Sequence, residues 1–154
     1  MKQRISLLIL ALLAPVYVWA ATDPSWIWLD EEKDGQSAWF VKSFSVEEGL
    51  EEAIVAGACD NELKIFINGD RVMQNGNWES VEVSPVKAKL KAGDNVIAIQ
   101  ASNQEGSTAA FCRLTLTYAN GKESAVVTDG TWKASATEQE GWAMPGYDAS
   151  AWGN

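Results

Sequence analysis

The chain of 154 residues contains no histidine, and it has only two cysteines and four prolines. The absence of histidine removes the side chain most often used as a general base and as a metal ligand. The sequence also lacks a Gly-x-Ser-x-Gly elbow, a phosphate-binding glycine loop and a Cys-x-x-Cys-His haem motif. These absences favour a binding module over an enzyme. A glycosidase fragment stays open as an alternative, because such enzymes need only two carboxylates.

Positive charge is also scarce. Twelve basic residues stand against 21 acidic ones, which gives a net charge of −9. An acidic surface repels nucleic acids and anionic membranes, so we expect neither as a partner. Neutral ligands, cations or plain solubility suit this balance. The short acidic clusters at Asp30-Glu31-Glu32 and Glu47-Glu48 are first interpreted as solvated loops and only second as metal sites.

One long apolar run occurs, at the N-terminus. Lys2 and Arg4 precede the apolar stretch 5–18, and Val18-Trp19-Ala20 fits a signal-peptidase site. An uncleaved anchor is the alternative, but the run is short of the ~20 apolar residues that span a bilayer. The sequence therefore predicts a signal peptide over 1–20 and one domain over 21–154. We expect that domain to be periplasmic or secreted and free of the membrane after cleavage.

The two cysteines, Cys59 and Cys112, each lie at the end of a predicted strand. Export to an oxidising compartment permits a disulfide between them, which is the prediction. The alternative is that both are small buried residues with free thiols. A cysteine-based metal site is disfavoured, because two ligands without histidine fall short of the usual four.

Short runs of alternating apolar and polar residues, separated by Gly, Asn and Asp, are typical of an all-β protein. Asn68-Gly69 between two such runs is the strongest hairpin signal, because both central positions of a type I′ turn need positive φ. The pattern predicts an antiparallel β-sandwich or jelly roll. The expected strands cover 38–46, 52–59, 63–67, 71–73, 81–90, 95–101, 111–118, 123–128 and 132–135.

Eight tryptophans are the most informative residues present, because the apolar face of a sugar ring packs on a flat indole. Trp78 follows the polar loop Asn75-Gly76-Asn77, where an exposed indole needs a reason. Asp60, Asn61 and Asn103 follow predicted strands, and their carboxylate and amide groups can bind sugar hydroxyls. The candidate carbohydrate site is therefore Trp78, Asp60, Asn61, Asn103 and Asn77. The alternative is that Asp60, Asn61 and Asn103 only cap turns.

Several segments, in order, resemble a known family. They are Asp60-Asn61 with 63–69, Trp78, 90–99 with Asn103, 128–133, Gly141-Trp142 and 147–152. This order resembles the galactose-binding-like jelly roll, including the accessory domain of bacterial α-L-rhamnosidases and sugar-binding domains of sialate acetylesterases and exported haem proteins. The resemblance covers roughly 25–152. It implies that Trp132, Trp142 and Trp152 are structural and that Asp129 and Asp148 tie down loops.

The resemblance also has a departure. In the family a further β segment follows the closing tryptophan, whereas this sequence ends at Trp152-Gly153-Asn154. A truncated product, or a last strand supplied otherwise, would explain the difference. The first functional hypothesis is an exported, non-catalytic carbohydrate-binding module. The alternative is a structural or docking domain, or fragment, of a larger exported glycoside hydrolase or c-type haem protein, with no sugar site of its own.

Two further predictions concern the N-terminal tryptophans and a structural calcium ion. Trp26 and Trp28 alternate on an N-terminal strand, so they share a face, either as a groove or as a belt over the sheet. No cofactor is expected. A structural calcium ion is compatible with the carboxylates of the chain. Calcium needs six to eight oxygen ligands, and no Asp-x-Asp-x-Asp loop occurs, so its ligands stay unassigned. The candidates are Asp30, Glu31, Asp34, Asp60 and Glu62.

Overall fold

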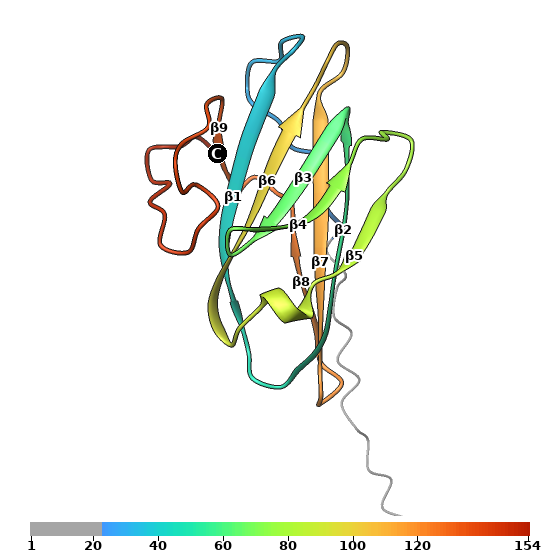
Figure 1. Cartoon of the computed structure of the whole chain (residues 1–154), viewed down its shortest axis with the longest axis vertical. Helices are drawn as coiled ribbons and strands as arrows, with labels where there is room; N and C mark the ends of the chain where they lie inside the picture. Colours follow the sequence, from blue (N-terminus) through green and yellow to red (C-terminus); the bar gives the residue numbers. More distant parts are fainter. Residues whose placement is uncertain (1–22) are drawn as a thin grey trace, which may run out of the picture.

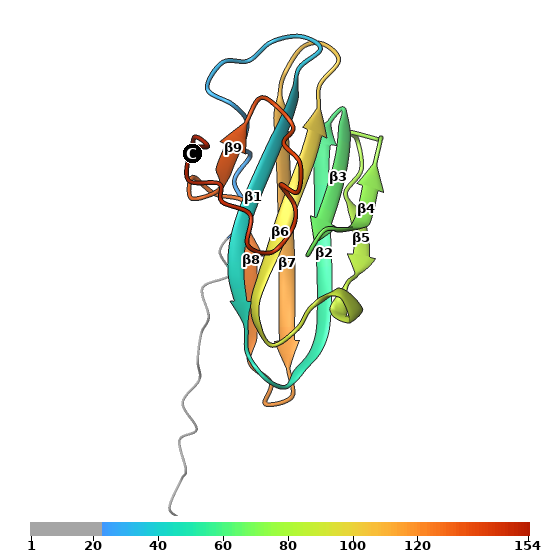
Figure 2. The same cartoon turned by 60° about the vertical axis from the view of Figure 1, so that its left-hand side comes forward.

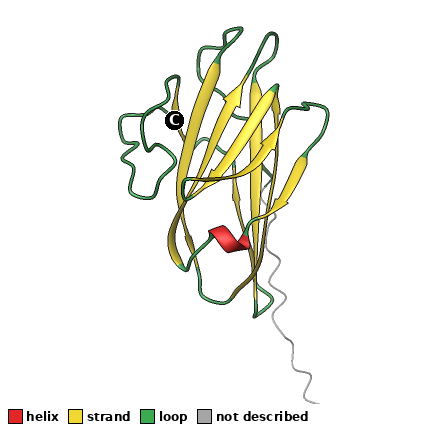
Figure 3. Cartoon of the chain, viewed as in Figure 1, coloured by secondary structure: helices red, strands yellow, loops and turns green. Residues whose placement is uncertain are grey.

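A computed structural model describes residues 23–154, and the predicted signal peptide lies outside these residues. Two antiparallel sheets pack face to face (Figures 1 and 2). One has the strand order β4-β3-β6-β1-β9 and the other the order β5-β2-β7-β8. Strands and loops make up almost all of the described chain (Figure 3). The predicted all-β sandwich is therefore confirmed.

The strands follow the predicted order along the chain. Their bounds are β1 Ser37–Val46, β2 Leu50–Asp60, β3 Glu62–Ile67, β4 Asp70–Asn75, β5 Glu82–Pro85, β6 Gly93–Ser102, β7 Ala109–Tyr118, β8 Glu123–Val127 and β9 Lys133–Ser135. In β7 the alternation is complete, because Cys112, Leu114, Leu116 and Tyr118 are buried between the sheets while the intervening residues are partly exposed. This period of two fixes the register of the pairing between β2 and β7.

The predicted hairpin joins β3 and β4. Asn68 and Gly69 have φ values of 52° and 90°, and Ile67 pairs with Asp70 across the turn. Both central residues thus have the positive φ that a type I′ turn requires. Gly69 also has a packing reason, since a Cβ there would lie 2.1 Å from the Sδ of Met144.

The stretch 81–90 differs from the prediction of one extended segment. It divides into the short edge strand β5 and a 3-10 turn, η1 Lys87–Lys89. Val86, between them, is buried in the core and donates its backbone N–H to the carbonyl of Ala53 (2.8 Å). Burial of this valine draws the chain inward, and Pro85 ends the edge strand because it has no N–H to donate.

The C-terminal segment 136–152 covers the outer face of the five-stranded sheet (Figure 2). Trp142 and Trp152 are 6% exposed and lie in a second apolar cluster over Val41, Val96 and Ala98. This cover explains why β6 is buried on both faces. After Trp152 the chain returns to β9, where Gly153 forms an antiparallel bridge to Ala134.

The structural roles predicted from the resemblance agree with this packing. Trp132 is 1% exposed and donates its indole N–H to the carbonyl of Val127 (2.8 Å). Asp129 and Asp148 each accept a hydrogen bond from the backbone N–H two residues on, from Thr131 and Ser150 (both 2.9 Å). These carboxylates fix the loops that carry the buried indoles.

The predicted disulfide is not present, because Cys59 and Cys112 are both buried free thiols. Cys59 pairs with Ala110 across the strands, whereas Cys112 pairs with Gly57. The cysteines are therefore diagonal neighbours, whose Cα atoms typically lie about 7–8 Å apart. Most disulfides need a shorter Cα separation. Burial raises the pKa of the Cys59 thiol to about 12 and raises that of Cys112 as well.

Candidate functional site

Four loops gather at one end of the sandwich, which we call the loop end (the upper end in Figure 1). They are 30–36, 60–61, 76–81 and 103–108. The pairing puts them together, because Asp60 lies opposite Ala109, Ser37 opposite Ser102 and Leu63 opposite Asn75. All five predicted sugar-binding residues therefore lie on loops, or at a strand end, at the same end of the molecule.

Asn61 links two of these loops through hydrogen bonds to the residues on either side of Asn103. Its backbone N–H donates to the carbonyl of Ser102 (2.8 Å), and its side-chain Oδ1 accepts from the N–H of Gln104 (2.7 Å). Asn61 thus bonds to the residue before Asn103 and to the residue after it. The local turn cap considered from the sequence is replaced by a bridge between distant segments.

The loop 30–36 is fastened to the same segment. The N–H of Asn103 donates to the carbonyl of Gln36, and that of Gly35 donates to the carbonyl of Gln104 (both 2.9 Å). Asp34 accepts from the N–H of Gly106 (3.1 Å). Three loops that are remote in sequence therefore support one another, which gives the loop end a defined shape.

The side chain of Asn103 is the most unusual group in this frame. Asn103 is 3% exposed, yet neither its Nδ2 nor its Oδ1 has a hydrogen-bond partner among the described residues. The hydroxyl of Thr108, in the same loop, is also buried without a described partner. Buried polar groups are nearly always hydrogen-bonded, and leaving one unpaired costs about 1–3 kcal/mol. The fold therefore leaves the hydrogen-bonding capacity of these two side chains unused among the described residues.

Trp78 lies in the loop between β4 and β5 and is 60% exposed. The loop is shaped by its own amides: Asn75 accepts from the N–H of Asn77 (2.8 Å) and donates to the carbonyl of Ser80 (2.7 Å). Asn77 in turn accepts from the N–H of Glu79 (3.1 Å). The side-chain oxygen of Asn77 is thus engaged in the turn, while the indole of Trp78 is displayed to solvent as predicted.

Asp60 ends β2 and is half-buried, and its peptide bond to Asn61 is cis. Sequence reasoning singled out Asp60, Asn61 and Asn103, but it missed Thr108. The signal available for Thr108 was its place at the end of the polar, glycine-containing segment Glu105-Gly106-Ser107. Its burial in the structure was not predicted, because a polar residue beside glycine and serine is typical of an exposed loop.

Trp26 and Trp28 contact different rings, although both line one surface pocket. Trp26 is 61% exposed and meets Phe111 edge-on, with ring centroids 4.6 Å apart. Trp28 tilts onto Phe40 at 6.3 Å and donates its indole N–H to Gln36 (2.8 Å). The expected N-terminal strand is reduced to a single bridge, Ile27 to Ala110, so strict alternation does not hold.

Residues 23–154 contain no group of three or more Cys, Asp or Glu side chains placed to hold a metal ion. The structural calcium thus stays a prediction without assigned ligands. Over the same residues, no helix has the length and hydrophobicity needed to cross a membrane.

Comparison with known proteins supports the predicted resemblance. No protein-family model matches the chain. The chain is 30% identical over 141 residues to an α-L-rhamnosidase of Streptomyces avermitilis. The aligned region covers 83% of this chain but only 14% of the enzyme. A crystal structure of the Streptomyces avermitilis α-L-rhamnosidase complexed with L-rhamnose superposes with a TM-score of 0.79 and 29% identity over 84% of this chain.

A lectin has the same fold. The Pleurotus ostreatus lectin in complex with GalNAc matches with a TM-score of 0.73 and 26% identity, over 84% of this chain and 40% of the lectin. The neighbours are therefore domains of rhamnosidases and a lectin, in agreement with a galactose-binding-like domain. Because the chain spans 14% of the rhamnosidase, the match concerns one small part of that enzyme.

Proposed function

We propose that this chain is an exported, non-catalytic carbohydrate-binding module that holds a neutral sugar at the loop end. The observation that carries the proposal is the buried amide of Asn103, which has a donor and an acceptor and no described partner for either. An amide can donate to one hydroxyl of a sugar and accept from the next, so adjacent hydroxyls satisfy both atoms.

The other residues supply the remaining parts of a sugar site. Asp60 offers a carboxylate that accepts from hydroxyls, and Trp78 offers an exposed indole face for the apolar side of the ring. Asn61 acts by positioning Asn103, since its own Oδ1 is bound to Gln104. Asn77 orders the turn that carries Trp78, because its side-chain oxygen accepts from the N–H of Glu79. Its amide group lies next to Trp78 in the sequence.

The relatives support a neutral sugar as the ligand. Two of them were solved in complex with L-rhamnose and with GalNAc, which are both uncharged, and this chain has a net charge of −9. An acidic chain disfavours anionic sugars by charge repulsion. Export follows from the predicted signal peptide and fits a module that meets extracellular glycans.

A docking role is the second candidate function. The chain corresponds to 14% of a rhamnosidase, and the outer face of its four-stranded sheet exposes the apolar side chain of Val83 (57%). A single exposed valine is ordinary for a protein surface, so the docking role is supported by the small share of the rhamnosidase that the chain matches. In that case the domain would hold a neighbouring domain of a larger enzyme, and the loop end would bind no sugar.

Isothermal titration calorimetry with L-rhamnose, GalNAc and D-galactose separates the two functions. We expect binding of at least one sugar, and loss of that binding in Trp78→Ala and in Asn103→Ala. Met144→Ala is the matched control, because Met144 is also exposed (50%) but lies on the C-terminal segment. Parallel titrations with calcium and with EDTA test the predicted ion. Absence of heat with every sugar under both conditions would favour docking, whereas wild-type binding by Trp78→Ala would mean that the sugar binds elsewhere on the domain.

A further inference from the structure

A second pocket opens at the edge of the sandwich, away from the residues proposed to bind sugar. It has a volume of about 230 Å³ and lies between the N-terminal segment 25–28 and the turn before β9. Four aromatic residues line it, together with one carboxylate and one amide: Trp26, Trp28, Phe40, Trp132, Asp129 and Asn154. We propose that this edge pocket is a second carbohydrate site, which takes a single neutral pyranose ring.

The aromatic residues give the pocket a fixed apolar lining. Phe40 and Trp132 are each 1% exposed and form its base, while Trp28 is half-buried and Trp26 is largely exposed. The indole N–H groups of Trp28 and Trp132 already donate to Gln36 and Val127 (both 2.8 Å). These bonds set the ring orientations, so what the two indoles offer a ligand is carbon surface. Such surface matches the C–H face of a pyranose.

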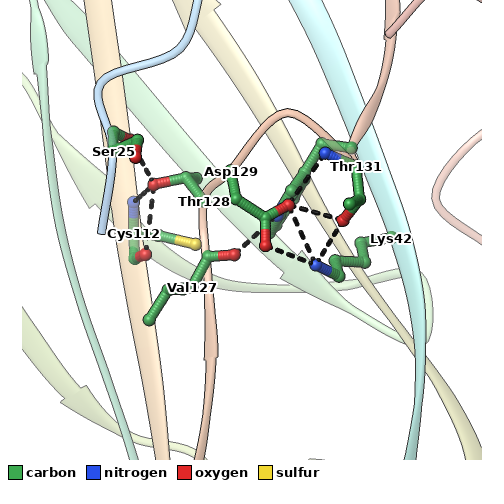
Figure 4. Close-up of polar contacts among 8 residues, drawn as sticks. Ser25, Lys42, Cys112, Val127, Thr128, Asp129 and Thr131 are labelled. Atoms are coloured by element: carbon green, nitrogen blue, oxygen red, sulfur yellow. Dashed lines mark hydrogen bonds and ion pairs between the residues drawn. The ribbon is translucent and has the colours of Figure 1, made fainter. Parts of the chain in front are cut away.

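Asp129 supplies the polar side of the pocket (Figure 4). Its Oδ1 accepts from the N–H and hydroxyl of Thr131, and Lys42 contacts both carboxylate oxygens at 3.1 Å. The Oδ2 atom therefore accepts a bond from Lys42 alone among the described residues, whereas Oδ1 accepts from Lys42 and Thr131. Oδ2 can still accept a hydrogen bond from a hydroxyl group. Asn154 accepts from Lys133 through Oδ1 (2.6 Å), which leaves its amide N–H groups to donate.

The charge of the pocket selects among ligands. Aromatic cages with a carboxylate commonly bind quaternary ammonium groups. Here Lys42 neutralises Asp129, and its ammonium group would repel a second cation. Hydrogen bonds from Thr131 and the charge of Lys42 outweigh burial and hold the pKa of Asp129 below its usual value, so the ion pair persists at neutral pH. A neutral ligand with hydroxyl groups fits this arrangement better.

The size of the pocket limits the ligand to one ring. Pockets for drug-sized molecules measure roughly 300–1,000 Å³, and this one is smaller at about 230 Å³. The site uses none of the residues assigned to the loop end, so it extends the proposed function and can be tested separately from it.

NMR of the tryptophan indole N–H groups tests the edge pocket. The resonances are assigned from single variants, and L-rhamnose, GalNAc, D-galactose, L-fucose and choline are titrated into wild type and Trp78→Ala. We expect at least one sugar to shift the Trp28 or Trp132 resonance in both proteins. Trp26→Ala and Asp129→Asn should each weaken this response at least fivefold, while the Trp78 resonance responds as in wild type.

The outcomes separate the two sites. If the loop-end proposal fails alone, the Trp78 resonance stays still while the edge-pocket resonances move. If the edge pocket fails alone, the reverse holds. Saturation by choline rather than by a sugar, or no shift of the Trp28 and Trp132 resonances with any sugar, would overturn the second site. Asp129→Asn keeps an Oδ1 acceptor for Thr131, and a cooperative unfolding transition confirms that it is folded.

Discussion

Two buried asparagines stand at opposite ends of β6 and differ in every contact their side chains make. Asn95, near the start of the strand, is fully buried; it donates to the carbonyls of Lys91 and Gly93 and accepts from Lys91 and Asn68. Asn103, just after the end of the strand, is almost as buried, but its amide has no described partner. The buried amide at one end of the sandwich is thus satisfied by the fold, and the one at the other end has no described partner.

The comparison teaches that residue type alone does not separate a structural group from a functional one. Both residues are asparagines, both are buried and both follow or begin the same strand. What differs is whether the fold satisfies their hydrogen bonds. The same contrast holds between the buried indole of Trp132, bonded to Val127, and the exposed indole of Trp78.

The largest expected effect is on folding at the end of the sandwich that holds Asn95. Asn95→Leu removes four hydrogen bonds of a fully buried side chain, including those to the backbone N–H and carbonyl of Lys91. We expect the free energy of unfolding to fall by about 2–4 kcal/mol. Chemical denaturation followed by tryptophan fluorescence measures this loss. A change below about 1 kcal/mol would mean that this network contributes little to stability.

The same substitution at the loop end sharpens the comparison. Asn103→Leu replaces an unpaired amide by an apolar group of similar size, so we expect stability within about 1 kcal/mol of wild type, or slightly higher. Sugar affinity measured by calorimetry should nevertheless fall roughly tenfold or more, because the hydrogen bonds to the ligand are lost. A destabilisation as large as that of Asn95→Leu would show that Asn103 is structural.

The cysteines test whether the loop end is as tightly closed as the rest of the core. Cys59 directly precedes Asp60, whereas Cys112 lies deeper in β7, and burial raises the pKa of both thiols. We expect neither to react with iodoacetamide at neutral pH until denaturant is added, since the thiolate is the reactive form. Mass spectrometry after digestion reads each site. Faster labelling of Cys59 than of Cys112 in the folded protein would reveal local opening at the loop end.

The smallest expected effect is on stability and concerns Asp129. Like Asn95, Asp129 has hydrogen-bond partners within the fold, namely Thr131 and Lys42. Its pKa is held below the ordinary value of 3.8, so its ionised form stabilises the fold above that pH and the contribution is lost as the pH falls further. We expect wild type to be slightly more stable than Asp129→Asn at neutral pH and the difference to shrink in acid below pH 3.8. Urea midpoints at the two pH values measure it. A difference that grows in acid would contradict the prediction.

The sequence predicted the fold well where a local pattern decides the outcome. The alternation in β7 and the Asn68-Gly69 turn both depend on neighbouring residues, and both were predicted correctly. The stretch 81–90 was not, because burial of Val86 is decided by a distant carbonyl, that of Ala53. The disulfide failed for a related reason, since the strand register places the two cysteines on a diagonal.

The sequence predicted that the candidate residues lie on loops at one end of the sandwich, but not which contacts hold those loops together, and sugar binding by these residues stays a prediction. Loop position and residue type picked out Asp60, Asn61 and Asn103, and the topology brings them to one end. That Asn61 flanks Asn103 with two bonds depends on contacts across some forty residues of chain. Only coordinates contain that information.

Pro85 has a consequence for how molecules of this protein behave at high concentration. Its strand, β5, is the outer strand of its sheet and only four residues long, and the proline closes it without an N–H. An edge of this kind offers a poor template for the strand of another molecule. The proline therefore disfavours edge-to-edge pairing of this sheet with the sheets of other molecules. Such pairing is the first step of fibre growth in β proteins.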